Sequence, residues 1–296
     1  MAILTIDIGG TAIKYAVMTE DADILRRGSV PTPQTGRAAL IDALAALYAD
    51  TPEAEGIAIA MPGIIDTENG YCAMGGALRY NDGFHLRRAL QEKCPVPVCM
   101  ENDAKCAAMA EARLGALRDV EDGFVIVLGT MIGGAFIKGH KLHRGKHFSA
   151  GEVSYINTVR DGHPVPENVW GNRCGASGLC AMYAQRKGLN AENVDGVQVF
   201  AALDGGDADA AAALRDYARE VAVQIFNIQN ILDPERFAIG GGISARPELV
   251  EAIREQLEEL YGACPYPVPH AEVTVCRFRN DANLYGALQC YLAQRG

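Results

Sequence analysis

Two stretches of this 296-residue sequence share one design: residues 3–17 read ILTIDIGGTAIKYAV and residues 124–138 read FVIVLGTMIGGAFIK. Each begins with an apolar run rich in β-branched residues, passes through a cluster of glycine and threonine, and ends in a second apolar run. This pattern is typical of a strand, a tight turn and a second strand. The repetition predicts two lobes, each of which contains one such hairpin.

Segments with helical spacing lie between and after the two hairpins. The expected helices cover residues 38–48, 103–117, 210–232, 247–260 and 283–294. Further buried strands are expected at 56–60 and 236–239, and a glycine-containing breaker follows each of them. Strands that alternate with helices indicate a layered α/β architecture.

The length of the chain allows two lobes, since a domain has roughly 150 residues. No low-complexity linker divides the sequence, so the two hairpins alone place the boundary near residues 115–122. We expect an N-terminal lobe at 1–118, joined by the C-terminal helix at 283–296, and a C-terminal lobe at 119–282.

The composition is that of a globular protein, with 49% hydrophobic and 22% charged residues. The formal net charge of -10 opposes binding to nucleic acids, because affinity for their phosphates depends on Lys and Arg. A small anionic ligand stays compatible with this charge, since a few backbone N–H groups can hold a phosphate. We expect no nucleic-acid partner.

The first 16 residues lack the basic and apolar regions of a secretory signal. No run approaches the roughly 20 apolar residues that cross a bilayer. The nine cysteines are odd in number and scattered, as suits reduced thiols. We therefore expect a cytoplasmic protein with no membrane partner.

The first glycine turn, Asp7 to Thr11, reads DIGGT. Its glycines let the backbone approach an anion closely, and Thr11 adds a hydroxyl donor for a phosphate oxygen. Asp7 stands at the end of the strand, where it is suited to hold water or Mg²⁺ beside phosphates. For one such motif alone, a hairpin turn that merely needs glycine is the favoured explanation, and only the repetition of the motif favours a ligand.

The second glycine turn, Gly129 to Gly134, reads GTMIGG. Two such loops, one from each lobe, are suited to hold a polyphosphate from opposite sides. Phosphoryl transfer depends mostly on positioning and electrostatic stabilisation, which these loops would supply. A third glycine cluster, GGGIS at 240–244, follows an apolar strand and leaves an open surface for adenine or ribose, although a plain turn is an alternative.

Glu101-Asn102-Asp103 precedes a helix rich in small residues. On the sequence alone, the simplest interpretation is that Asn102 or Asp103 is the N-cap of that helix. A carboxylate at a helix N-terminus also stays ionised, as a base that accepts a hydroxyl proton must be. The two roles are compatible.

DIGGT, ENDA at 101–104, GTMIGGA at 129–135, Gly151-Glu152 and GGGIS stand in the order found in the ROK family of sugar kinases. The chain resembles that family over nearly its whole length. The resemblance implies a two-lobed α/β fold of the actin/hexokinase-like (ribonuclease H-like) ATPase type with a cleft between the lobes. It also implies an ATP-dependent sugar kinase that uses Mg²⁺ and forms a homodimer.

The resemblance assigns roles to individual residues, with Asp103 as the catalytic base. The residues that would bind sugar are Gly75, Gly76, Ala77, Asn102, Asp103 and Glu152. The residues that would bind the nucleotide are Asp7, Gly9, Gly10, Thr11, Lys14, Thr130, Gly133, Gly134, Gly241 and Gly242.

The sequence departs from the family at its zinc site, which one His and three Cys usually form. Tyr155 stands where that His would be, and residues 172–180, NRCGASGLC, keep one thiol at the matching positions. A tetrahedral zinc site needs four ligands, so we predict no structural zinc. His140, His143 and His147 are a second candidate metal cluster, which we interpret as solvated loop residues.

The substrate is a separate question, because Ala181 stands where the family places a sugar-binding Glu. Residues 70–78, GYCAMGGAL, resemble the equivalent stretch of bacterial β-glucoside kinases, a zinc-lacking branch of the family. This branch phosphorylates the 6-hydroxyl of the non-reducing glucose in cellobiose and related glucosides, which makes a β-glucoside the favoured substrate. Glucokinase and N-acetylmannosamine kinase activities are alternatives.

Two functions of other classes are alternatives to a kinase. Sugar-sensing ROK-type regulators share the fold but carry a helix-turn-helix before the first hairpin, and here the first strand is expected from Ile3. The chain would be such a regulator without its DNA-binding domain. An ATPase of the same superfold would need no sugar, against which Asn102, Asp103 and Glu152 argue.

Overall fold

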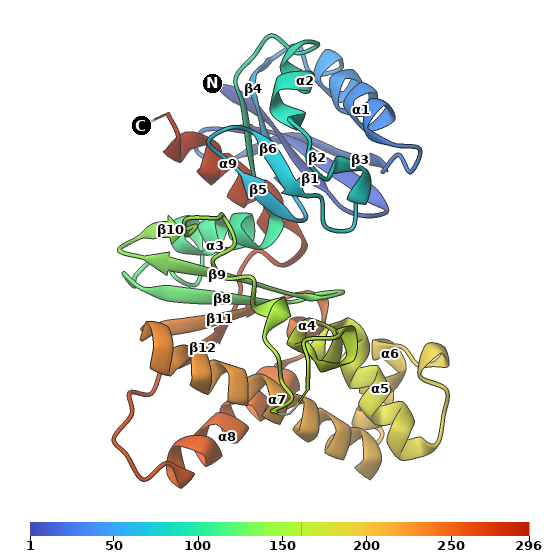
Figure 1. Cartoon of the computed structure of the whole chain (residues 1–296), viewed down its shortest axis with the longest axis vertical. Helices are drawn as coiled ribbons and strands as arrows, with labels where there is room; N and C mark the ends of the chain where they lie inside the picture. The colour runs from blue at the N-terminus through green and yellow to red at the C-terminus, as the bar shows by residue number, and fades with distance from the viewer. Residues whose placement is uncertain (161, 296) are drawn as a thin grey trace. The chain divides into compact units, whose positions relative to one another are not determined.

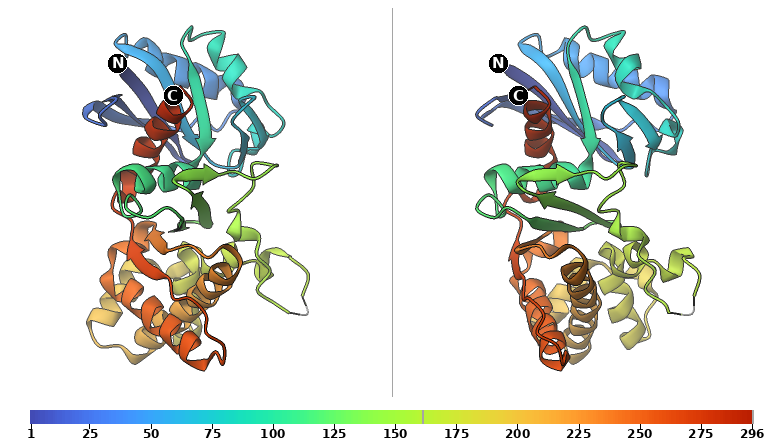
Figure 2. Two further views of the ribbon diagram at one scale, coloured as in Figure 1. Left: turned by 90° about the vertical axis from the view of Figure 1, so that its left-hand side faces the viewer. Right: turned by 60° about the vertical axis from the view of Figure 1, so that its left-hand side comes forward.

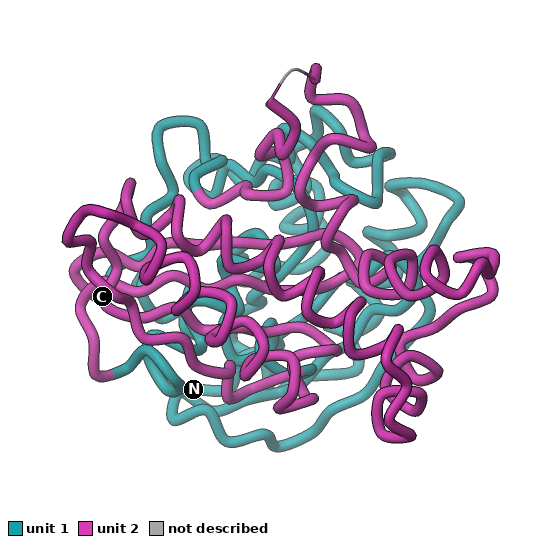
Figure 3. Tube along the Cα trace, turned by 90° about the horizontal axis from the view of Figure 1, so that it is seen from below, with its two compact units in different colours: residues 1–118, 141–150, 280–296 teal, residues 119–140, 151–279 magenta. Residues whose placement is uncertain are grey.

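The computed structural model describes residues 1–160 and 162–295, which form two compact units (Figure 3). Unit 1 comprises Met1–Arg118, Lys141–Ala150 and Asn280–Gly296, and unit 2 comprises Asp119–His140 and Gly151–Arg279. The units differ from the expected lobes at residues 141–150 and 280–282, which belong to unit 1. Residues 141–150 are held there because Arg144 forms an ion pair with the buried Glu101. The last residue of the expected helix 283–296 lies outside the described residues.

The sheet of unit 1 contains the first predicted hairpin. Its strands lie in the order β3-β2-β1-β4-β7, with β2 antiparallel to its neighbours and β1, β4 and β7 parallel. Six of the seven residues of β1 are buried, as expected of a parallel strand covered on both faces. The bounds are β1 (Ala2–Ile8), β2 (Ala12–Thr19), β3 (Ile24–Pro31), β4 (Ala54–Met61) and β7 (Val98–Asn102).

Helices cover the sheet of unit 1, and the C-terminal helix α9 packs against β1, β4 and β7 (Figures 1 and 2). Helix α9 also packs along α3, the helix that follows β7. The remaining elements of unit 1 are α1 (Arg37–Ala49), β5 (Ile64–Asp66), β6 (Tyr71–Met74), α2 (Leu86–Gln91), α3 (Asp103–Leu114), β10 (Lys141–His143) and α9 (Ala282–Ala293).

Helices α3 and α9 approach closely because Gly286 has no side chain. A Cβ atom on Gly286 would overlap the backbone carbonyl of Cys106. We expect Gly286→Ala to lower stability by about 2 kcal/mol, since the overlap with rigid backbone outweighs the better helix propensity of alanine. The midpoint of urea unfolding measures this effect.

Gly262, in helix α8 (Pro247–Ala263), offers a matched control, because a Cβ there has nothing within 4 Å. Gly262→Ala should keep or raise the unfolding midpoint. Equal midpoints for wild type and Gly286→Ala would contradict the close approach.

Unit 2 contains the second predicted hairpin, in which β8 and β9 are antiparallel. Strands β9, β8, β11 and β12 lie side by side in that order. The bounds are β8 (Gly123–Leu128), β9 (Ile132–Lys138), α4 (Trp170–Cys174), α5 (Ala176–Lys187), α6 (Gly196–Asp204), α7 (Ala208–Leu232), β11 (Arg236–Gly240), α8 (Pro247–Ala263) and β12 (Glu272–Val275). Short 3₁₀ turns occur at Arg79–Asn81, Val153–Tyr155, Pro166–Asn168, Ala191–Asn193, Gly242–Ala245 and Arg279–Asp281.

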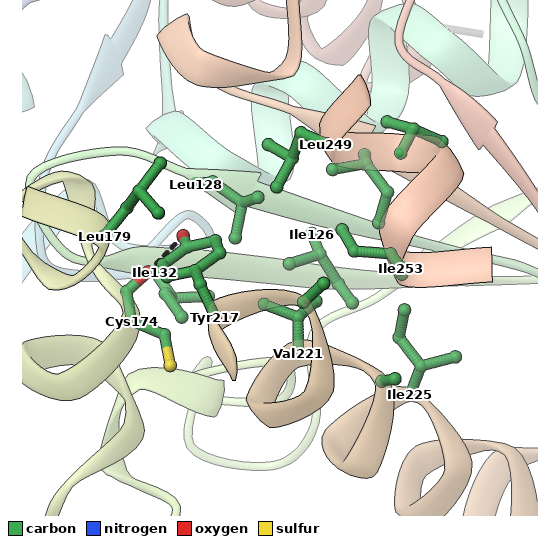
Figure 4. Close-up of a cluster of buried hydrophobic side chains, with 14 of the residues drawn as sticks. Ile126, Leu128, Ile132, Cys174, Leu179, Tyr217, Val221, Ile225, Leu249 and Ile253 are labelled. Carbon is green, nitrogen blue, oxygen red and sulfur yellow. Dashed lines mark hydrogen bonds between the residues drawn. The ribbon is translucent and has the colours of Figure 1, made fainter. Parts of the chain in front are cut away.

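The core of unit 2 lies between this sheet and helices α7 and α8 (Figure 4). Tyr217, Val221 and Ile225 of α7 are buried at helical spacing, as the prediction for residues 210–232 requires. The hydroxyl of Tyr217 donates a 2.6 Å hydrogen bond to the carbonyl of Cys174, which satisfies its polar end inside the core. Across the described part of the chain, no helix has both the length and the apolar character needed to span a bilayer.

Candidate active site

Three loops of unit 1 meet at one edge of its sheet. Strands β1, β4 and β7 are parallel neighbours, so their carboxyl ends point the same way. The pairs Asp7–Ala60 and Met61–Asn102 fix the register near those ends. Ligands of open α/β sheets commonly bind at the carboxyl ends of the strands. This edge is therefore the candidate site of unit 1.

The first glycine turn is held by the side chains of Thr32 and Gln34, which no motif in the sequence identifies. The Gly9 amide donates to the carbonyl of Ala12 at 3.0 Å. The hydroxyl of Thr32 donates to the Gly9 carbonyl at 2.7 Å, and the Gln34 side chain donates to the Gly10 carbonyl at 2.8 Å. These bonds occupy the carbonyls of the turn. They support one conformation of the turn.

Asp7 is buried, with 8% of its surface exposed, and lies opposite Lys14 in the hairpin. Burial raises the pKa of its carboxyl, and a hydrogen bond from Asn283 and the charge of Lys14 oppose this rise. The Asn283 Nδ2–Oδ1 distance is 3.0 Å. Asn283 comes from α9, at the far end of the sequence, and no local signal identifies it.

Of the two N-cap candidates, Asn102 caps α3, and Asp103 lies inside the helix. Asn102 is the N-cap of α3, since its Oδ1 accepts from the amide of Lys105 at 3.0 Å. Its Nδ2 donates to the Gly63 carbonyl and to Asp103 Oδ1, both at 3.0 Å. Asp103 is the first residue of the helix and half-buried, and its Oδ1 also accepts from the Ala104 amide at 2.8 Å. The positive end of α3 favours the ionised carboxylate there.

The loop at Gly75, Gly76 and Ala77 lies beside the first glycine turn. Gly76 has a φ of 59°, and a Cβ on it would lie 2.9 Å from the amide nitrogen of Gly63. A Cβ on Gly10 would lie 3.8 Å from that of Ala77. Unit 1 thus places the predicted phosphate-binding turn near the loops predicted to bind sugar.

A buried ion pair lies directly behind Asn102. Glu101 is 1% exposed, and its Oε1 accepts from the Asn102 amide at 2.9 Å while its Oε2 accepts from Arg144 Nε at 2.7 Å. Burial raises the pKa of Glu101, and Arg144 is the largest influence that opposes the rise. No local pattern in the sequence identifies either residue as the partner of the other.

The second glycine turn lies against the start of α5 in unit 2. The Gly129 carbonyl accepts from the Ala176 amide at 2.6 Å, and Gly175 packs against the carbonyl of Thr130. Gly133 and Gly134 lie inside β9 rather than in the turn. A Cβ on Gly134 would lie 2.7 Å from the Gly151 carbonyl, so this glycine lets the segment before Glu152 approach the strand.

The third glycine cluster follows β11, which is parallel to β8, so it lies at the same edge of the unit 2 sheet as the second glycine turn. Gly241 has a φ of 97°, and a Cβ on it would overlap the carbonyl of Leu128 at the end of β8. Ser244 Oγ donates to the Gly241 carbonyl at 2.8 Å. A Cβ on Gly242 would meet nothing within 4 Å, which agrees with an open surface.

The predicted site residues thus form two groups, one in each unit. Unit 1 holds Asp7, Gly9, Gly10, Thr11, Lys14, Gly75, Gly76, Ala77, Asn102 and Asp103. Unit 2 holds Thr130, Gly133, Gly134, Glu152, Gly241 and Gly242.

Tyr155 and the two cysteines of residues 172–180 lie in the segment that the sequence resemblance compares with a zinc site. Tyr155 is half exposed, and Cys174 and Cys180 are buried. Burial raises the pKa of Cys174 to about 12, which disfavours the thiolate that binds metal. Trp170 is completely buried in the core. Within residues 1–160 and 162–295, no three His, Cys, Asp or Glu side chains are grouped for a metal.

Known proteins of one family match this chain over nearly its whole length. Residues 3–295 match the model of the ROK family. The β-glucoside kinase of Klebsiella pneumoniae is 34% identical over 291 residues, which cover 97% of this chain and 95% of that protein. A ROK family protein from Streptococcus pneumoniae TIGR4, solved in complex with sucrose, is 31% identical with a TM-score of 0.89 and covers 100% of this chain and 99% of its own.

A third match is a ROK family glucokinase from Streptomyces griseus, solved in complex with glucose and AMPPNP. It is 27% identical with a TM-score of 0.85, and the match covers 100% of both chains. These structures confirm the predicted α/β fold of the actin-like ATPase type.

Proposed function

Because the chain belongs to the ROK family, we propose that it is a sugar kinase that transfers the γ-phosphate of ATP to the 6-hydroxyl of a β-glucoside such as cellobiose. The observation that carries the proposal is the placement of Asp103. Its carboxylate lies at the start of α3, beside Asn102, at the sheet edge that also holds the first glycine turn. A base and a phosphate-binding turn at one edge are what phosphoryl transfer to an alcohol requires.

On the acceptor side, Asp103 takes the proton of the 6-hydroxyl as its oxygen attacks the γ-phosphorus. The new O–P bond forms as the bond to the β-phosphate oxygen breaks, and ADP leaves. Asn102 binds a sugar hydroxyl and keeps Asp103 in position through its 3.0 Å bond to Oδ1. Gly75, Gly76, Ala77 and Glu152 provide further sugar contacts.

On the donor side, the backbone N–H groups and hydroxyls of the two glycine turns bind phosphate oxygens. Lys14 contributes a positive charge, and Gly241 and Gly242 leave a surface for the nucleoside. Asp7 fits a role beside Mg²⁺, since burial already raises the pKa of its carboxyl and a cation would offset that cost. Bound Mg²⁺ would neutralise phosphate charge.

The preference for a β-glucoside has two supports. The chain lacks the Glu and His that the family uses for further sugar hydroxyls, with Ala181 and Tyr155 at those positions. The Klebsiella pneumoniae relative is named a β-glucoside kinase. Glucokinase and N-acetylmannosamine kinase activities are the alternatives that a substrate screen must separate.

Location and assembly are further proposals. We propose that the enzyme is cytoplasmic, since its nine cysteines are scattered along the sequence and, in the described residues, are free thiols. The homodimer stays a prediction, which sedimentation of the purified protein tests.

A kinase screen tests the proposed function. With ATP and Mg²⁺, cellobiose should give a kcat/KM about tenfold or more above those of glucose, N-acetylmannosamine and fructose. NMR of the product should place phosphate on O6 of the non-reducing ring. ADP release without any phosphorylated sugar would contradict the proposal and favour an ATPase, whereas a preference for glucose or N-acetylmannosamine would favour the corresponding alternative.

A further inference from the structure

Unit 1 contains a hollow of about 500 Å³ that the proposed catalytic residues do not line. Its walls are the tip of the β5–β6 hairpin and the segment after β10. The lining residues are Asp66, Glu68, Asn69, Arg144, Gly145, Lys146 and Phe148. The volume is within the range of small-molecule sites.

The hollow is linked to the proposed sugar site through both walls. Strand β5 directly follows Gly63, which accepts the hydrogen bond of Asn102, and β6 leads directly into Gly75. At about 3.3 Å per residue, Asp66 lies about 10 Å along the chain from Gly63. On the other wall, Arg144 is bonded to Glu101, one residue before Asn102. A second ring attached to a sugar beside Asn102 would extend over such a distance.

Several polar groups around the hollow are available to a ligand. Among the described residues, the carboxylate of Glu68 and the ammonium of Lys146 have no ion-pair partner, and only Nε of Arg144 is hydrogen-bonded. Asp66 differs, because its Oδ1 already accepts from the amides of Glu68 and Asn69, both at 3.0 Å. Phe148 adds a half-buried aromatic ring.

These groups suit a neutral ring with several hydroxyls. Glu68 accepts hydrogen bonds from hydroxyl groups, Lys146 and Arg144 donate hydrogen bonds to hydroxyl oxygens, and the ring of Phe148 packs against the apolar face of a sugar. The lining has two acidic and two basic side chains, so it favours neither an anion nor a cation. A free phosphate or a metal ion fits less well.

We propose that this hollow binds the second ring of a disaccharide β-glucoside, the group joined to O1 of the glucose that is phosphorylated. The proposal rests on the proposed function, because it names where the remainder of that substrate binds. Glu68 and Lys146 then determine specificity for disaccharides over simple glucosides.

The test compares cellobiose with methyl β-glucoside, in which a methyl group replaces the second ring. In the double variant Glu68→Ala/Lys146→Met, kcat/KM for cellobiose should fall about tenfold through the loss of two hydrogen bonds, whereas kcat/KM for methyl β-glucoside should stay unchanged. Glu92→Gln, an exposed acidic residue outside the hollow, is the control and should change neither value. The single variant Lys146→Met should show a smaller loss of the same kind.

Equal effects on both substrates, or no loss with cellobiose, would overturn the proposal. Calorimetry with cellobiose and methyl β-glucoside separates this failure from a failure of the proposed function. If wild type phosphorylates no sugar, weaker cellobiose binding in the double variant would still support the hollow as a disaccharide site, and unchanged binding would exclude it. The unfolding midpoint of each variant shows that the fold is retained.

Discussion

Asp103→Asn is expected to lower kcat for the sugar substrate by about 10² to 10⁴, the usual contribution of a general base. The amide oxygen of Asn can still accept from Asn102 Nδ2 and the Ala104 amide, so the start of α3 should keep its conformation. It cannot take up the hydroxyl proton. A coupled assay of ADP release measures kcat, and calorimetry should show that sugar binding is retained.

Asp21→Asn provides the matched control, because Asp21 is exposed and lies in the turn between β2 and β3. It should leave kcat unchanged. If Asp103→Asn retained activity within a few-fold of wild type, Asp103 would not be the base, and another group near the sugar would have to accept the proton.

The sequence predicted the two hairpins and the long helices because each has a strong local signal. The apolar run before Gly9 becomes β1, and the periodic apolar residues of 210–232 become α7 at Ala208–Leu232. Strand β7 was not predicted, since its five residues, VCMEN, include Glu101, which is buried only because Arg144 pairs with it. Helix α5 was missed as well, because its many small residues give little periodicity.

The candidate site shows the same limit. Gly9, Gly10 and Asp103 could be proposed from motifs, because glycine turns and N-terminal carboxylates have characteristic sequences. The groups that hold Gly9 and Asp7 could not be predicted in this way. Thr32 contacts Gly9, and Asn283 contacts Asp7, only after the chain has folded. Long-range partners of this kind leave no pattern in a single sequence.

Arg144→Met is expected to destabilise the protein by about 3 kcal/mol at about pH 7.5, because it leaves the buried carboxylate of Glu101 without its partner. Methionine keeps much of the side-chain volume, so the loss reports mainly on charge. The midpoint of urea unfolding measures it. Arg113→Met is the control, because Arg113 is an exposed residue of α3, and it should leave the midpoint nearly unchanged.

The loss of stability caused by Arg144→Met should be smaller at about pH 5 than at about pH 7.5. Burial raises the pKa of Glu101 in the folded chain, so protonation of this carboxyl favours folding. That contribution is present at low pH and disappears as the pH rises through the folded pKa. Without Arg144 the folded pKa should rise further, and near pH 5 the variant can fold with a neutral carboxyl.

Glu101→Gln tests whether the buried charge of Glu101 causes the loss of stability in Arg144→Met. Added to Arg144→Met, it should recover part of the lost stability at about pH 7.5, since no buried charge then remains, and a double-mutant cycle gives the coupling between the two residues. A loss of equal size at both pH values would instead indicate that Arg144 stabilises unit 1 by packing. Arg144 and Glu101 would then hold the segment after β10 in place, and Arg144 would have little effect on whether Glu101, behind Asn102, is ionised.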